Sequence, residues 1–115
     1  MKKQLLVILS FLFLISCSSI KNTQEAISNG NYDNAMNIAI ENLKKNKTKK
    51  GNQPYILMLE EAFAKAVSKD EAKIVFLKKE NNPESLETIF GLYTSLKNRQ
   101  EWLKPLLPLP IIKEN

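Results

Sequence analysis

The sequence predicts an all-α fold built from short antiparallel helix hairpins. Between residues 22 and 104, apolar residues recur at the i, i+3, i+4 and i+7 spacing of helices, and no segment alternates convincingly with a period of two. Gly, Asn and Pro divide this stretch into pieces joined by two to eight residues, which favours helices packed against their sequence neighbours. A chain of 115 residues is long enough for one small domain.

Two helices are expected first. Asn22, followed three residues later by Glu25, has the spacing of a helix capping pair, and Gly30 can supply the left-handed cap that ends a short helix. The next helix is predicted by one apolar stripe, and Lys44 and Lys45 follow it at the end where the helix dipole favours positive charge. The stripe consists of Tyr32, Ala35, Met36, Ala39 and Leu43.

A polar loop over 46–53 leads to Pro54, which suits the first position of a third helix. The start of this helix is apolar on nearly all sides, so we expect it to be buried. A capping-box pattern at 68–71 predicts a break, after which a fourth helix places Ala72, Val75 and Phe76 inward. Residues 81–83, Asn-Asn-Pro, are expected to close this fourth helix.

A fifth helix and a sixth one complete the expected domain. The sixth begins at Asn98 and must end before Pro105. The inward stripe of the fifth helix is Leu86, Ile89, Phe90, Tyr93 and Leu96. Core packing is the expected role of Tyr32, Tyr55, Phe63, Phe76, Phe90 and Tyr93. Trp102, near the end of the last helix, is left unassigned.

The last segment, 105–115, is apolar and contains three prolines within six residues, so it is predicted to be extended. Apolar residues are not expected to stay in water. Three explanations remain open: the tail folds back over the last helices, it pairs with a partner, or the chain is a truncated form of a longer protein.

The N-terminus has the features of an export signal. Lys2 and Lys3 precede an apolar run over 5–15 that is broken only by Ser10 and is short for a membrane-spanning helix. Residues 14–17, Leu-Ile-Ser-Cys, resemble the lipobox of bacterial lipoproteins. The resemblance implies cleavage before Cys17 and lipid on its thiol, and several acyl chains make such anchoring stable. An ordinary secretory signal and an uncleaved anchor are the alternatives.

This interpretation divides the chain into a signal peptide at 1–16, a tether at 17–22, a helical domain at 23–104 and a tail at 105–115. Ser18 and Ser19 follow the cysteine, and no acidic residue appears before Glu25. By analogy with lipoprotein sorting in enteric bacteria, these residues favour the outer membrane, facing the periplasm.

Residues 30–39 resemble the turn into the second helix of a tetratricopeptide repeat, through Gly30, Tyr32 and Ala35. Asn82-Pro83, with Gly91 and Tyr93, is similar to the start of a later repeat. The pattern departs from the family because Ala35 and its counterpart Ala72 are 37 positions apart, against a period of 34 residues. The whole chain also resembles the N-terminal part of uncharacterised lipoproteins from Bacteroidota-type bacteria.

The composition argues against most catalytic chemistry. The chain has no His, and its one Cys is assigned to lipid, so no His-based metal site and no Cys-His nucleophile can form. Glu60 and Glu61 are neighbours that point about 100° apart on a helix and make a poor acid–base pair. Three isolated glycines form no phosphate-binding loop. We therefore expect no enzyme activity, no small-molecule substrate and no cofactor.

The charge pattern argues against nucleic-acid binding and offers one candidate contact with a membrane. Without Lys2 and Lys3, fifteen basic residues stand against twelve acidic ones, and Arg99 is the only arginine. Anionic lipid head groups attract clustered lysines, at about 1 kcal/mol each, but a solvated helix end and loop is the favoured explanation of such a run. The candidate membrane-contact residues are Lys44, Lys45, Lys47, Lys49 and Lys50.

The leading functional hypothesis is a lipid-anchored helical module that binds another envelope protein of unknown identity. The alternatives are the N-terminal module of a larger lipoprotein and, third, an envelope enzyme that acts on peptidoglycan or peptides.

Overall fold

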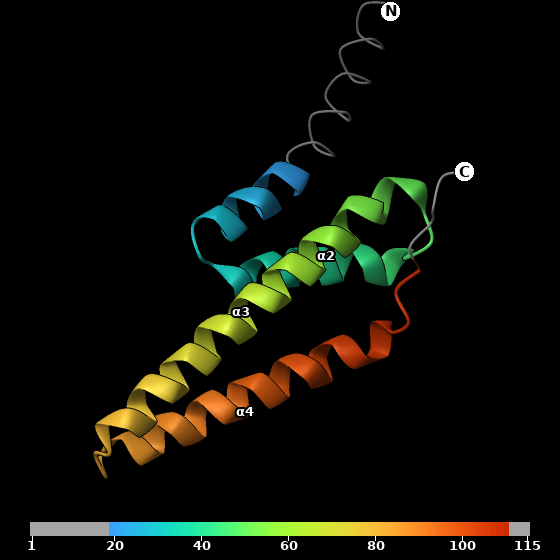
Figure 1. Cartoon of the computed structure of the whole chain (residues 1–115). Helices are drawn as coiled ribbons and strands as arrows, with labels where there is room; N and C mark the ends of the chain where they lie inside the picture. Colours follow the sequence, from blue (N-terminus) through green and yellow to red (C-terminus); the bar gives the residue numbers. More distant parts are fainter. Residues whose placement is uncertain (1–18, 111–115) are drawn as a thin grey trace, which may run out of the picture.

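The computed structural model describes residues 19–110, and this part of the chain is all-α, which confirms the predicted fold class (Figure 1). Residues 19–28 are helical, and three longer helices follow: α2 (Tyr32–Lys45), α3 (Gln53–Glu80) and α4 (Ser85–Leu103). Two 3₁₀ turns, Lys50–Asn52 and Lys104–Leu106, flank them. The predicted signal peptide and the lipidation site Cys17 lie outside the described residues.

The first described helix includes residue 19, so the predicted start at Asn22 is wrong. The hydroxyl of Thr23 donates a hydrogen bond of 2.8 Å to the carbonyl oxygen of Ser19, one turn earlier in the same helix. Residues 19–22 of the predicted tether are therefore helical. Gly30 ends the helix as expected, with φ at +80° and with the hydrogen bonds of a Schellman motif from Gly30 to Ile27 and from Asn31 to Ala26.

α3 is a single helix of 28 residues, and the predicted break at 68–71 is wrong. A capping box stabilises a helix start only where the preceding residues leave the helix. Here residues 66–73 contain no Gly or Pro, and their Lys, Glu and Ala residues are good helix formers. For the same reason α4 runs through Asn98 without interruption. Pro54 lies in the first turn of α3, as predicted, and Asn81, at φ +51°, ends it.

The hydrophobic core lies where residues 19–28, α2 and the first half of α3 meet (Figure 1). The predicted stripe of α2 is buried apart from Tyr32, which is half-buried. Tyr55 is buried and Phe63 is partly buried against the same cluster, as is Trp102. We call this part of the molecule the base. Its largest fully buried side chains are Met36, Ile40, Leu43, Ile56, Leu59 and Thr23.

Beyond the base, the second half of α3 and the part of α4 that lies beside it form a two-helix projection, which we call the arm (Figure 1). α4 contains no buried residue, and the last buried residue of α3 is Ile74. Several apolar side chains that the sequence placed in the core are exposed here, so their predicted inward orientation is wrong. Their exposed fractions are 52% for Val75, 59% for Phe76, 66% for Leu86, 73% for Phe90 and 47% for Tyr93.

The helical stripes are present in the arm, but a third layer to cover them is missing from the described residues. Ile89 and Leu96 are half-buried, as expected of the side of α4 that faces α3. A helix hairpin hides only the strip along which its two helices touch.

The tail returns to the base through residue 110. Leu106 is 5% exposed and belongs to the core, and Leu109 packs against the same cluster. The ammonium group of Lys47 donates hydrogen bonds of 3.1 Å to the carbonyl oxygens of Leu106 and Pro108. Residues 105–110 therefore fold back onto the base, as the first of the three explanations predicts.

Candidate functional site

The predicted lysine cluster lies at the C-terminal end of α2 and in the loop that follows it. Lys45 and Lys49 border a hollow of about 660 Å³ whose lining also includes Ser19 and Ile20. The side-chain amide of Asn42, which belongs to the same lining, donates a hydrogen bond of 3.5 Å to the Ser19 hydroxyl. The structure therefore brings two of the candidate lysines beside the first described residues, which lie two positions after Cys17.

The loop that carries these lysines is held by side-chain amides. The Asn46 side-chain oxygen accepts hydrogen bonds from the backbone amides of Thr48 and Lys49, at 3.1 and 3.2 Å. The Asn52 amide donates at 2.8 Å to the carbonyl oxygen of Asn46. Such Asn-centred turns fix a polar loop without burying it. The backbone that carries the lysines is thus held in a defined conformation.

The five candidate lysines do not behave alike. Lys44, Lys45, Lys49 and Lys50 are exposed, and Lys44 lies 3.5 Å from Glu41 in a solvent-exposed pair. Lys47 is half-buried, because its ammonium group binds the two tail carbonyls. The structure therefore groups Lys47 with the tail, apart from the other four.

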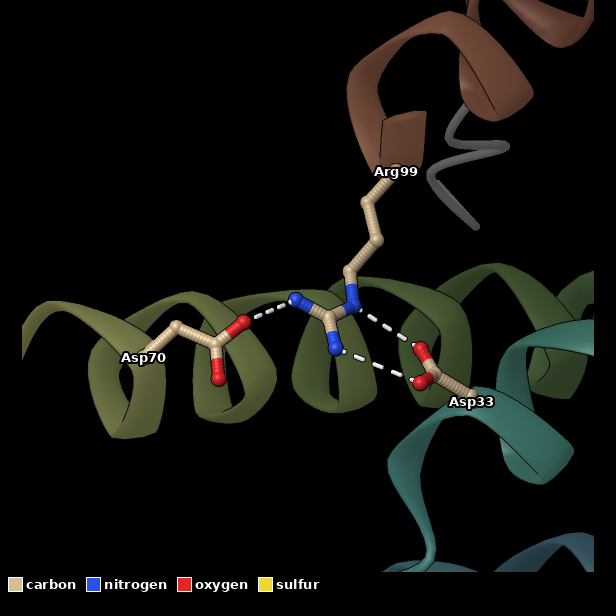
Figure 2. Close-up of polar contacts among 3 residues, drawn as sticks. All are labelled: Asp33, Asp70 and Arg99. Carbon is tan, nitrogen blue, oxygen red and sulfur yellow. Dashed lines mark hydrogen bonds and ion pairs between the residues drawn. The ribbon is translucent and has the colours of Figure 1, made fainter. Parts of the chain in front are cut away.

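Arg99 occupies a position that the sequence did not reveal, between three helices (Figure 2). Its guanidinium donates two hydrogen bonds to the carboxylate of Asp33 on α2, at 2.8 Å from Nε and 3.2 Å from Nη2. Nη1 donates to the carboxylate of Asp70 on α3. The exposed fractions of the side chains are 14% for Arg99, 12% for Asp70 and 63% for Asp33. One arginine of α4 thereby links α2 in the base to α3 at the position where the arm begins.

Within this cluster, the Arg99–Asp33 contact favours the charged forms of both groups. The hydrogen bond from Arg99 holds the pKa of Asp33 below its ordinary value of 3.8, against the opposing effect of burial. The Asp33 hydrogen bond likewise raises the pKa of Arg99, so the guanidinium stays protonated at any pH at which the protein is handled. The pair is bidentate, which adds geometric specificity to the charge interaction.

The geometry of the Arg99 cluster is suited to holding helices together. Both carboxylates accept hydrogen bonds from the same guanidinium, so one side chain of α4 holds α2 and α3 at a single point. The adjoining hollow, about 350 Å³, is lined by Ser95, Asn98 and Trp102 besides Asp33 and Arg99. Glu61 lies 2.8 Å from Lys65 in an exposed ion pair, and Glu60 is exposed.

Two further observations concern residues 19–110. No group of three or more His, Cys, Asp or Glu side chains gathers there as a metal site would require. No helix in the same part of the chain is both long and apolar enough to cross a bilayer.

The Arg99 cluster left only a weak trace in the sequence, namely one arginine among sixteen lysines. Arginine is the residue that can bind two carboxylates in a fixed plane, so its single use marks a position that lysine would fill poorly. Its partners are 66 and 29 positions away, which no local pattern can show.

No protein-family model, no curated protein and no solved structure matches this chain.

Proposed function

We propose that this chain is a lipid-anchored lipoprotein of the cell envelope, held at the outer membrane on the periplasmic side, and that it binds another protein rather than catalysing a reaction. The observation that carries the proposal is the separation of two surfaces. Lys45 and Lys49 lie beside Ser19, close to the proposed lipid on Cys17. Most of the large apolar side chains that are exposed among the described residues lie on the arm, which points away from residues 19–28 (Figure 1). Leu57 and Leu107, which belong to the base, are the exceptions.

The proposed anchor is close to the folded base. Two residues of extended chain span at most about 7 Å, and that is the interval from Cys17 to the helical residue Ser19. A lipid on Cys17 would hold the hollow bordered by Lys45 and Lys49 near the head groups. A juxtamembrane lysine gains about 1 kcal/mol from an anionic surface, so the lysines would orient the base toward the bilayer.

Lipidation is the first prediction. In bacterial membranes the mature chain is expected to begin at Cys17, with a diacylglycerol on the thiol and, in most molecules, an acylated amino group. Intact-mass and N-terminal peptide mass spectrometry measure this directly. Cys17→Ala is expected to abolish both the lipid and the cleavage. An unmodified cysteine, or cleavage at another position, overturns the anchoring proposal.

The second prediction concerns the lysines. Residues 18–115 contain every core residue described above, so this unlipidated fragment can be tested with anionic vesicles in a sedimentation assay. Replacing Lys45 and Lys49 with Gln is expected to weaken binding at low salt by about 2 kcal/mol, which is on the order of 30-fold.

The matched control removes the same charge from the arm, where Lys69 and Lys73 are also exposed. Lys69→Gln with Lys73→Gln is expected to change vesicle binding only a few-fold. Equal losses in the two double variants would show that net charge alone governs binding. Binding that does not respond to salt would contradict the lysine contact itself.

A further inference from the structure

The exposed apolar residues of the arm fall largely on one side. Leu86, Phe90 and Tyr93 follow one another at i, i+4 and i+7, so they form a stripe along α4. The Lys78 ammonium donates a 2.8 Å hydrogen bond to the Tyr93 hydroxyl and lies 5.3 Å from the centre of its ring. The stripe therefore borders the side of α3 that carries Lys78.

The neighbouring stripe on α3 is short and has charged ends. Val75 precedes Lys78 by three residues and Glu71 precedes Val75 by four, which places these three side chains along one side of α3. On α4, the stripe ends with Lys97, four residues after Tyr93. We call these two adjacent stripes the arm face. It consists of Glu71, Val75 and Lys78 on α3 and Leu86, Phe90, Tyr93 and Lys97 on α4.

We propose that the arm face binds the arm face of a second copy of this chain, so that the two hairpins form an antiparallel four-helix bundle. The two-fold axis would run along the arms. Each α4 would then oppose the α3 of the other copy, and both bases would lie at the same end. This docking does not depend on lipidation, although it suits two anchors in one membrane.

The register of the bundle follows from the turn at the tip of the arm. Val75 lies five residues before the end of α3 at Glu80, and Phe90 lies five residues after the start of α4 at Ser85. The two are therefore at the same height in the hairpin. A two-fold axis along the arm preserves heights, so Phe90 would meet Val75 of the second copy.

Charge complementarity supports the same register. Glu71 lies nine residues before the end of α3, and Lys97 lies twelve residues after the start of α4, less than one turn apart in height. In the proposed bundle, each Lys97 would lie near the opposing Glu71. A head-on pairing of α4 with α4 along the same axis would instead set Lys97 against Lys97, which costs affinity. The arm face is thus self-complementary, as a two-fold interface requires.

The available area fits a specific but modest dimer. With exposed fractions of 52%, 66%, 73% and 47%, Val75, Leu86, Phe90 and Tyr93 offer on the order of 500 Å² of surface per copy. Two copies would bury about 1,000 Å², where specific interfaces begin. Phe90 is at the centre and has the largest exposed fraction, so it is the expected anchor.

Sedimentation equilibrium of residues 18–115 at about 100 μM tests the proposal, and the expected mass is that of a dimer. Phe90→Glu is expected to raise the dimer Kd by about 30-fold or more, and Phe90→Ala by about tenfold. Phe76→Glu is the matched control, because Phe76 is 59% exposed on the same arm but lies about 100° around α3 from Val75. It should leave the mass of the dimer unchanged.

A charge exchange tests the register. Lys97→Glu is expected to weaken the dimer several-fold, and Glu71→Lys combined with Lys97→Glu is expected to restore it. Circular dichroism melts establish that each variant is folded. A monomeric parent chain overturns the proposal, as do equal losses for Phe76→Glu and Phe90→Glu. A monomer whose vesicle binding is lost in Phe90→Glu would assign the arm face to lipid instead.

Discussion

Arg99→Ala is expected to lower the free energy of unfolding by about 3 kcal/mol, at the lower end of the cost of breaking a buried ion pair. Most of this loss of stability comes from the broken contact with Asp70 on α3. Asp70 is only 12% exposed, and without the guanidinium its carboxylate is left partly buried near the junction of base and arm. The bidentate contact with Asp33 adds less, because Asp33 is largely exposed. Urea unfolding followed by circular dichroism measures the change.

The double variant Arg99→Ala with Asp70→Ala separates the two contributions. Removing the stranded carboxylate is expected to recover part of the lost stability, since an uncompensated buried charge costs more than an absent pair. Arg99→Lys keeps the charge but cannot form the planar fork, so it is expected to fall between the parent and Arg99→Ala. A loss below about 1 kcal/mol for Arg99→Ala would mean that the cluster does not hold the helices together.

The same cluster gives the stability a defined pH dependence. The pKa of Asp33 is lowered in the folded protein, chiefly by its hydrogen bond from Arg99. A lowered pKa stabilises the fold fully above the ordinary value of 3.8, and this contribution disappears as the pH falls through the lower folded value. The parent chain should therefore lose somewhat more stability on acidification than Asp33→Asn, by less than about 1 kcal/mol because Asp33 is exposed.

Deletion of residues 105–115 is expected to destabilise the protein by about 4 kcal/mol, and Leu106→Ala alone by about 3 kcal/mol. Leu106 belongs to the core of the base, and its removal leaves a cavity between the helices. The deletion also removes Leu109 and leaves the half-buried Lys47 ammonium without its two carbonyl acceptors. Thermal and urea melts of residues 18–115 measure both variants.

Leu107 is the matched control for this prediction. It is adjacent in sequence and of the same type, but it is 55% exposed. Leu107→Ala is expected to change the unfolding free energy by no more than about 0.5 kcal/mol. Unchanged melting after deletion of the tail would show that the fold-back contributes nothing to the stability of the base.

The sequence located the helix ends correctly where Gly, Pro or Asn is incompatible with, or disfavours, continued helix. Gly30 and the Asn81–Pro83 turn are such positions, because they require left-handed or non-helical backbone. The capping-box pattern at Ser68 and Glu71 is compatible with a helix start but does not require one. The helix continued through them, since the surrounding residues favour helix and Asp70 is held by Arg99.

Periodicity identified the right stripes but not what covers them. The stripe of α2 is buried because residues of α3 and of the helix at 19–28 pack with it in one core cluster. The stripe of Leu86, Phe90 and Tyr93 has the same spacing, yet these side chains are exposed. Spacing specifies that residues share a face, whereas burial depends on how many other elements reach that face, which is a property of the whole fold.

The polar contacts of the base were the least predictable from sequence. Lys47 was one lysine in a run of five, and its difference from the others arises from carbonyl groups 59 and 61 positions away. Arg99 likewise depends on distant carboxylates. Charged side chains carry no periodic signature of their partners, so such pairs emerge only when the helices are packed.

Because α3 runs without a break from the base into the arm, the length of the arm can change in evolution without a change in the base. At 1.5 Å per residue, its 28 residues extend about 42 Å from the loop of the base to the tip of the arm. Apart from Asp70 and Ile74, the described side chains beyond Ala66 on this helix are not buried, so the outer turns pack against little besides α4. Paired insertions or deletions of two turns in α3 and α4 beyond Ile74 would alter the reach of the protein and leave the base as it is. Reach and stability can therefore diverge independently in this architecture.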